Sequence, residues 1–153
     1  MPNWEKDLKR GEDGERVLMS AFKMVKSNDR RWDLITQYKK KLELKTCFLG
    51  HGTGNFAIEQ FSNKEKQTIG GVDRAVRDGA DVFAYLIYYT QKCYFWKPSV
   101  LKEEVSKANK WISETTNRKG MPDEYTTTNQ IIKIADLEGS CFKVETIDKK
   151  HFK

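Results

Sequence analysis

Three residues in the first third of the chain could hold a divalent metal ion and use it for hydrolysis. Asp33 lies in one short apolar segment, and Glu43 and Lys45 lie two residues apart in the next. Mg²⁺ prefers oxygen ligands and is commonly held by one or two carboxylates, so Asp33 and Glu43 would suffice if folding brings them together. Lys45 can then hold the attacking water or stabilise the charge that develops on a phosphate. The pattern favours metal-dependent hydrolysis of a phosphodiester.

Two short strands must position these residues. We expect strands over residues 32–36 and 41–48, joined as an antiparallel hairpin through the polar stretch 37–40. Alternation along the second strand places Glu43 and Lys45 on one face and the flanking leucines on the other. The competing interpretation of Glu43 and Lys45 is a solvated ion pair on an exposed strand.

A third acid precedes the strands. Residues 14–26 carry apolar side chains at helical spacing, and Glu15 falls on that same apolar stripe. An acid that leans inward can join the carboxylates of the strands. Alternatively, Glu15 is a first-turn residue that the helix dipole favours.

The remaining elements complete an α/β pattern. The sequence predicts a third strand over 56–61, a short helix over 72–79, a central strand over 82–89 and a strand over 92–97. After Pro98, helical spacing runs to Ile112, residues 117–129 are expected to form a loop, and short strands follow over 130–135 and 141–147. We expect a single domain over residues 1–153, with helices packed on one sheet.

Glu15, Asp33 and the Glu43-Leu44-Lys45 triplet resemble the PD-(D/E)xK nuclease superfamily, in particular its small stand-alone members in bacteriophages and mobile elements. Trp32 occupies the position before Asp33, where the name of the motif has proline. The resemblance covers residues 14–97. It implies a restriction-endonuclease-like core, a mixed central sheet flanked by helices in the order α-β-β-β-α-β.

The resemblance also implies roles for individual residues. Asp33, Glu43 and the backbone carbonyl of Leu44 would hold Mg²⁺, with Mn²⁺ able to replace it, and Glu15 would complete the acidic cluster directly or through water. Lys45 would complete the catalytic set.

The charge balance is compatible with a nucleic-acid partner. Lysine and arginine number 28 against 22 acids, giving a net charge of +6 and a pI of about 9.1, which favours a polyanion only modestly. We expect phosphate contacts from Arg74 and Arg77 on the short helix and from the lysine-rich stretches 39–41 (Lys39, Lys40 and Lys41) and 64–66. Solvated surface charge is the alternative for each of them.

Other residues receive no catalytic role. Glu59 and Asp81 are expected to be a solvent-facing strand residue and a turn residue. The glycine-rich stretch 50–55 predicts a flexible connection, with groove contact by His51 or Asn55 as the lesser alternative, and neither His51 nor His151 has partners nearby in sequence. Trp96 and Trp111 are expected in the core or in an interface.

The cysteines and the apolar segments of the sequence indicate the cellular compartment. Three widely spaced cysteines give neither a disulfide framework nor a zinc spacing. The longest apolar run, 82–89, is too short for a membrane span, and the first residues have no apolar signal core. We therefore expect a cytoplasmic protein of a bacterial or phage-infected cell.

The functional hypothesis is an endonuclease that cuts DNA, with a homing, recombination or junction-cleaving role possible. A homodimer is expected, because a small subunit with one site must cut two strands. The alternatives are a non-catalytic nucleic-acid-binding or regulatory protein of the same fold, and an interaction protein in which the motif arose by chance.

Overall fold

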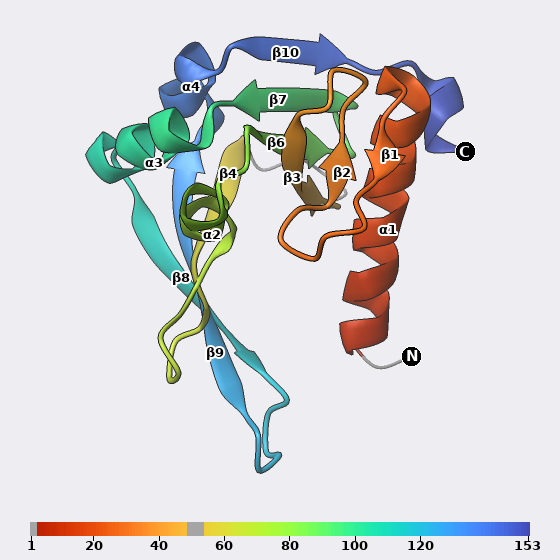
Figure 1. The fold of residues 1–153 in the computed structure, drawn as a ribbon. Helices are drawn as coiled ribbons and strands as arrows, with labels where there is room; N and C mark the ends of the chain where they lie inside the picture. Colours follow the sequence, from red (N-terminus) through yellow and green to blue (C-terminus); the bar gives the residue numbers. More distant parts are fainter. Residues whose placement is uncertain (1–2, 49–53) are drawn as a thin grey trace.

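The computed structural model describes residues 3–48 and 54–153, with side chains from residue 8 onward. Two sheets form the framework (Figure 1). The first has the order β1-β2-β3-β6-β7-β10, and the second the order β5-β4-β9-β8. The strands of the first sheet are β1 Val25–Lys26, β2 Leu34–Ile35, β3 Lys41–Cys47, β6 Val82–Ile87, β7 Lys92–Trp96 and β10 Lys143–Thr146. Those of the second are β4 Asn55–Asn63, β5 Thr68–Ile69, β8 Trp111–Asn117 and β9 Tyr125–Lys133.

The first sheet is mixed, as expected from the sequence. Its central pair, β3 and β6, is parallel, and the pairs on either side are antiparallel. Helices lie on both faces of this sheet: α1 Asn3–Phe22 on one, and α2 Gly71–Asp78 and α3 Pro98–Lys107 on the other. The α/β class predicted from the sequence is therefore confirmed.

α1 differs from the predicted helix over 14–26 at both ends. It begins at Asn3 and ends at Phe22, because Lys23 has a left-handed backbone with φ of 55°. Val25–Lys26 then forms β1, which pairs with β2. Val25 fits the helical spacing of the sequence only by coincidence, because it belongs to β1, the two-residue strand that follows the helix.

The predicted third strand lies in the second sheet, so the expectation of one sheet is wrong. β3 pairs with β6 over Leu42–Cys47 on one edge and with β2 at Lys41 and Leu42 on the other. β4 pairs instead with β9, about seventy residues later in the chain. Phe56 and Ile58 of β4 are buried against Phe83 and Tyr85 of β6, so the two sheets share a core.

The chain after α3 also departs from expectation. α3 ends at Lys107 rather than continuing to Ile112, and the Lys110 ammonium donates hydrogen bonds to three carbonyls at its end, at 2.7–3.4 Å. β8 begins at Trp111, and much of the predicted loop 117–129 belongs to β9. Threonine favours strands, and the consecutive threonines of this segment pair with β8.

Three short helices complete the C-terminal part: α4 Ile134–Leu137, η1 Glu138–Ser140 and η2 Lys149–Phe152. The last residues of the predicted strand 130–135 are thus helical. Trp96 is fully buried, whereas Trp111 is 52% exposed and lies outside the core.

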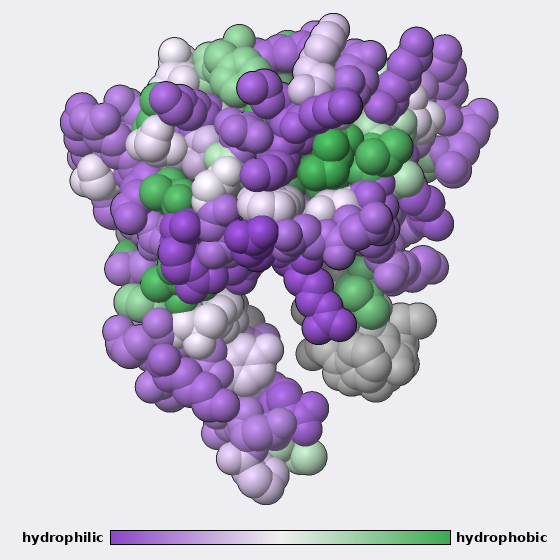
Figure 2. Space-filling model, viewed as in Figure 1, coloured by the Kyte–Doolittle hydropathy of each residue, from purple (hydrophilic) through white to green (hydrophobic). Residues whose placement is uncertain are grey.

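The β8–β9 hairpin extends well beyond the body of the molecule (Figure 1) and forms a mainly hydrophilic projection (Figure 2). We call it the arm. None of the helices described has the length and apolar character that a membrane crossing requires. Cys47, Cys93 and Cys141 are free thiols.

Gly14 allows α1 to approach β3 closely. A Cβ at Gly14 would collide with the Thr46 side chain, whereas a Cβ at Gly11, also inside α1, meets nothing within 4 Å. We expect Gly14→Ala to lower the free energy of unfolding by about 1–3 kcal/mol, as overpacking does. Gly11→Ala should raise it by roughly 0.5–1 kcal/mol through helix propensity. Urea unfolding measures both, and equal effects of the two changes would contradict the close contact.

Candidate active site

Asp33 is held against β3 by two hydrogen bonds. Its backbone N–H donates to the Leu42 carbonyl at 3.0 Å, and its carboxylate oxygen Oδ2 accepts from the Leu44 N–H at 2.7 Å. The second bond lies just before β2 begins, where the backbone pairing with β3 stops. The Asp33 side chain is therefore fixed across the strand that carries Glu43 and Lys45.

Glu43 is a buried acid next to another acid. Only 8% of the residue is exposed. Burial, the negative charge of Asp33 and a hydrogen bond with Asp33 together raise the pKa of Glu43 to about 9, against an ordinary value of 4.5. Two carboxyl groups this close cannot both be ionised without a nearby cation.

The donor set fits a hard divalent cation. Asp33 and Glu43 supply carboxylate oxygens, the ligands that Mg²⁺ prefers. The N–H and C=O of one strand residue point to the same edge, so the Leu44 carbonyl faces the edge on which Asp33 lies. A cation bound by Asp33, Glu43 and this carbonyl would relieve the repulsion between the acids.

Glu15 lies on the inner side of α1, and 16% of its side chain is exposed. Lys26 Nζ lies 3.4 Å from its carboxylate. Burial, and after it the charge of Asp33, raise the pKa of Glu15. In the described ranges, no three acidic, histidine or cysteine side chains lie close enough to hold one metal ion together.

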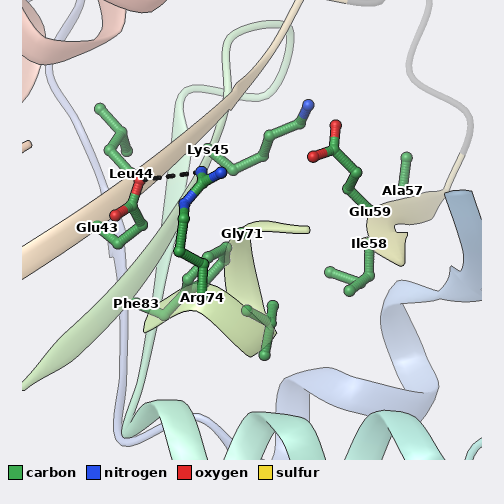
Figure 3. A pocket seen from close by; sticks show the side chains of 10 residues that line it. Glu43, Leu44, Lys45, Ala57, Ile58, Glu59, Gly71, Arg74 and Phe83 are labelled. Atoms are coloured by element: carbon green, nitrogen blue, oxygen red, sulfur yellow. Dashed lines mark ion pairs between the residues drawn. The ribbon is translucent and has the colours of Figure 1, made fainter. Parts of the chain in front are cut away.

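Arg74 faces the acids rather than the solvent. The sequence placed Arg74 and Arg77 together on the outside of the short helix, but the Arg74 guanidinium lies 3.8 Å from a Glu43 carboxylate oxygen (Figure 3). Only 38% of its side chain is exposed. Arg77 is more exposed and pairs with Asp78 at 3.0 Å. The two arginines therefore have different surroundings.

Glu59 belongs to the site, although the sequence favoured a solvent-facing role for it. It lines a pocket of about 150 Å³ together with Glu43, Lys45 and Arg74. Lys45 from β3 and Glu59 from β4 extend to the same side of this pocket (Figure 3). The alternation of side chains along β4 shows from the sequence which face of the strand carries Glu59. Only the packing of the second sheet on the first brings that face next to β3.

A larger cleft of about 600 Å³ opens from the site. Its residues come from α1 and β3 on one side and from β4, β8 and β9 on the other. The acidic and basic side chains that line it are Arg10, Glu15, Asp33, Lys45 and Glu59. Asp33 and Lys45 thus share one open space, which is wide enough for a substrate rather than a single ion.

The other candidates lie elsewhere. The exposed Lys39 and Lys40 occupy the turn before β3, and the exposed Lys41 begins β3; all three are outside the lining of the cleft. The Lys41 ammonium lies 4.4 Å from the centre of the Trp32 ring. Asp81 accepts a hydrogen bond from the Lys41 N–H at 2.9 Å, which agrees with a turn role.

His151 and Asn55 lie away from the lining of the site. His151 Nδ1 lies 2.7 Å from the Ser20 hydroxyl, on the side of α1 near the C-terminus. His51 lies outside the described residues. Asn55 begins β4 and is absent from the lining of both spaces at the site.

Comparison with protein-family models gives no match, and comparison with curated protein sequences gives none either. The likeness to PD-(D/E)xK nucleases therefore remains a likeness of residues and their order. The function has to be argued from the geometry of the site.

The buried acid pair predicts a pH dependence for the metal-free protein. Between about pH 4.5 and 9, folded Glu43 keeps its proton while unfolded Glu43 loses it. Folding then binds a proton, so the free energy of unfolding should fall as pH rises through this window, by up to about 1.4 kcal/mol per pH unit. Glu43→Gln carries no titrating group and should remove this slope.

Urea unfolding in EDTA at a series of pH values, for the wild type and Glu43→Gln, measures the difference. Parallel profiles would show that Glu43 titrates normally in the folded protein.

Proposed function

We propose that the chain is a metal-dependent endodeoxyribonuclease of the PD-(D/E)xK type, which hydrolyses DNA phosphodiester bonds. The observation that carries the proposal is the Asp33–Glu43 pair: Asp33, fixed by the Leu44 N–H, lines the large cleft with Lys45, and Glu43 lines the smaller pocket with Lys45. Two acids this close stay ionised together only beside a cation, and a metal-bound phosphodiester site provides one.

The order of elements in the first sheet supports the proposal. α1, β1, β2, β3, α2 and β6 follow one another as α-β-β-β-α-β, with β4 and β5 set aside in the second sheet. β1, β2 and β3 form an antiparallel meander, and β6 is parallel to β3. The motif residues accordingly lie next to the centre of the sheet.

Asp33, Glu43 and the Leu44 carbonyl would hold Mg²⁺ or Mn²⁺. The bound cation would lower the pKa of a water ligand and neutralise charge on the phosphate. The Lys45 ammonium would hold the attacking water or stabilise the phosphate in the transition state. Glu59, on the same side of the pocket, would orient Lys45, and the positive charge of Arg74, which lowers the pKa of Glu43, would favour loss of the Glu43 proton when metal binds.

The proposal includes DNA as partner, a homodimer that cuts both strands, and the reducing interior of a bacterial or phage-infected cell. Arg77 and the lysines of the turn before β3 are sites where DNA phosphates would bind outside the cleft. The competing function is a non-catalytic nucleic-acid-binding or regulatory protein. Retention of Glu15, Asp33, Glu43 and Lys45 together favours catalysis, since binding alone needs no buried acid pair.

Cleavage assays test the proposal directly. Linear, circular, branched and single-stranded DNA are incubated with the protein and Mg²⁺, Mn²⁺ or EDTA. We expect cleavage with either metal and none in EDTA, and we expect Asp33→Ala and Glu43→Ala to abolish it while the fold and DNA affinity persist. Asp136→Ala, an exposed acid on α4, is the matched control. Metal-dependent cleavage by either site variant would refute the assignment.

Lys45 separates a catalytic from a structural role. Lys45→Ala should retain Mg²⁺ binding, because the metal ligands remain, but should lose roughly two to four orders of magnitude in single-turnover cleavage. Lys45→Arg keeps the charge and should recover part of the rate. Rates are compared at saturating Mg²⁺ and protein, and a Lys45→Ala rate within about threefold of wild type, as for a solvated strand residue, would end the catalytic assignment.

A further inference from the structure

The arm contributes one wall of the cleft. Register along the hairpin places Thr115 opposite Thr127 and Ser113 opposite Asn129. Asn129 is in turn opposite Glu59 on β4. Directly opposed residues share a face of a sheet, so one continuous face runs from the arm to the site. Thr115, Asn117, Tyr125, Thr127 and Asn129 all line the cleft.

The cleft-facing side chains of the arm are polar but uncharged. Over residues 111–133 the chain has three acids, Glu114, Asp123 and Glu124, and three bases, Arg118, Lys119 and Lys133, so its net charge is zero. Two of these acids are paired, Glu114 with Lys64 at 2.7 Å and Asp123 with Arg118 at 2.6 Å. The arm therefore adds nothing to the +6 charge of the chain. Attraction to phosphates must come from other residues.

Hydroxyl and amide groups on a two-stranded β-ribbon can form hydrogen bonds with the edges of DNA bases. A β-ribbon fits the major groove of B-DNA, and asparagine and threonine side chains form hydrogen bonds with bases there. Arg10 and Lys45, in the same cleft, supply the cations that would hold the phosphate backbone.

We propose that the arm enters the groove of double-stranded DNA and reads base edges with its cleft-facing hydroxyl and amide groups. The inference rests on the proposed nuclease function and names its substrate class as duplex rather than single-stranded DNA. The arm selects where the duplex is cut, and the acid site below it cuts.

Neighbouring residues of the same type on opposite faces of the arm provide matched variants. Thr115→Val with Asn129→Ala removes polar groups from the cleft face. Thr116→Val with Gln130→Ala removes similar groups from the other face, because successive strand residues alternate. Thr115 and Thr116 are both exposed, so neither replacement disturbs a core.

The cut positions are mapped with Mg²⁺ on a random-sequence duplex and on the corresponding single strand. Affinity for the preferred duplex is measured in EDTA over a range of salt concentrations. We expect the cleft-face variant to lose its preference among sequences and about tenfold in affinity for the preferred duplex, the range of one lost base contact. Its slope of log affinity against log salt should match that of wild type, because no charge is removed. The opposite-face variant should behave like wild type.

Equal cut patterns for wild type and the cleft-face variant, or a uniform loss of affinity with the pattern unchanged, would overturn base reading by the arm while leaving the nuclease proposal intact. Faster cleavage of the single strand than of the duplex would overturn the substrate class. Wild-type protein that neither binds nor cuts any DNA would refute the nuclease proposal and this inference together.

Discussion

The repulsion between the buried carboxyl group of Glu43 and the partly buried carboxyl group of Asp33 is the constraint around which the site is built. Asp33 is fixed by the Leu44 N–H, and Glu43 projects from β3 with only 8% of the residue exposed. Water would screen the two charges, but burial removes that screening and leaves proton uptake or a cation as the remedies. Arg74, whose guanidinium lies 3.8 Å from a Glu43 carboxylate oxygen, is the positive side chain of the protein that faces this acid. A site with these properties favours binding of a divalent ion.

The packing of the two sheets determines what surrounds the acids. Phe56 of β4 contacts the rings of Tyr85, Tyr94 and Trp96 at centroid distances of 4.8–5.3 Å. The Ala57 N–H donates to the Tyr85 hydroxyl at 3.1 Å, which ties β4 to β6 at the base of the cleft. This aromatic contact brings Glu59 to Lys45 and fixes the root of the arm. The acid site and the cleft-facing side of the arm thus depend on one hydrophobic contact between the two sheets.

Local patterns indicated most strands of the first sheet, although β1 was predicted as part of a helix. Alternation along 41–48 placed Glu43 and Lys45 on one face, and both line the same pocket, because successive side chains of a strand point to opposite faces. The central strand was evident from its apolar run, and α2 from its helical stripe. Boundaries were weaker: α1 and α3 were each predicted to continue past their ends, since helical spacing in a sequence does not show a left-handed residue or a competing strand partner.

The amino-acid sequence by itself determined the acids, the lysine on the same strand as Glu43 and the α/β class, because these depend on residue type and short-range period. Tertiary structure decided the rest. The second sheet arises from pairing of β4 with β9, whose partners are about seventy residues apart, and no local period in the sequence indicates such a pairing. The position of Glu59 in the site, the contact of Arg74 with Glu43 and the strand conformation of the threonine-rich stretch could not be read from the sequence. Each depends on which strand or helix packs against that residue in the folded chain.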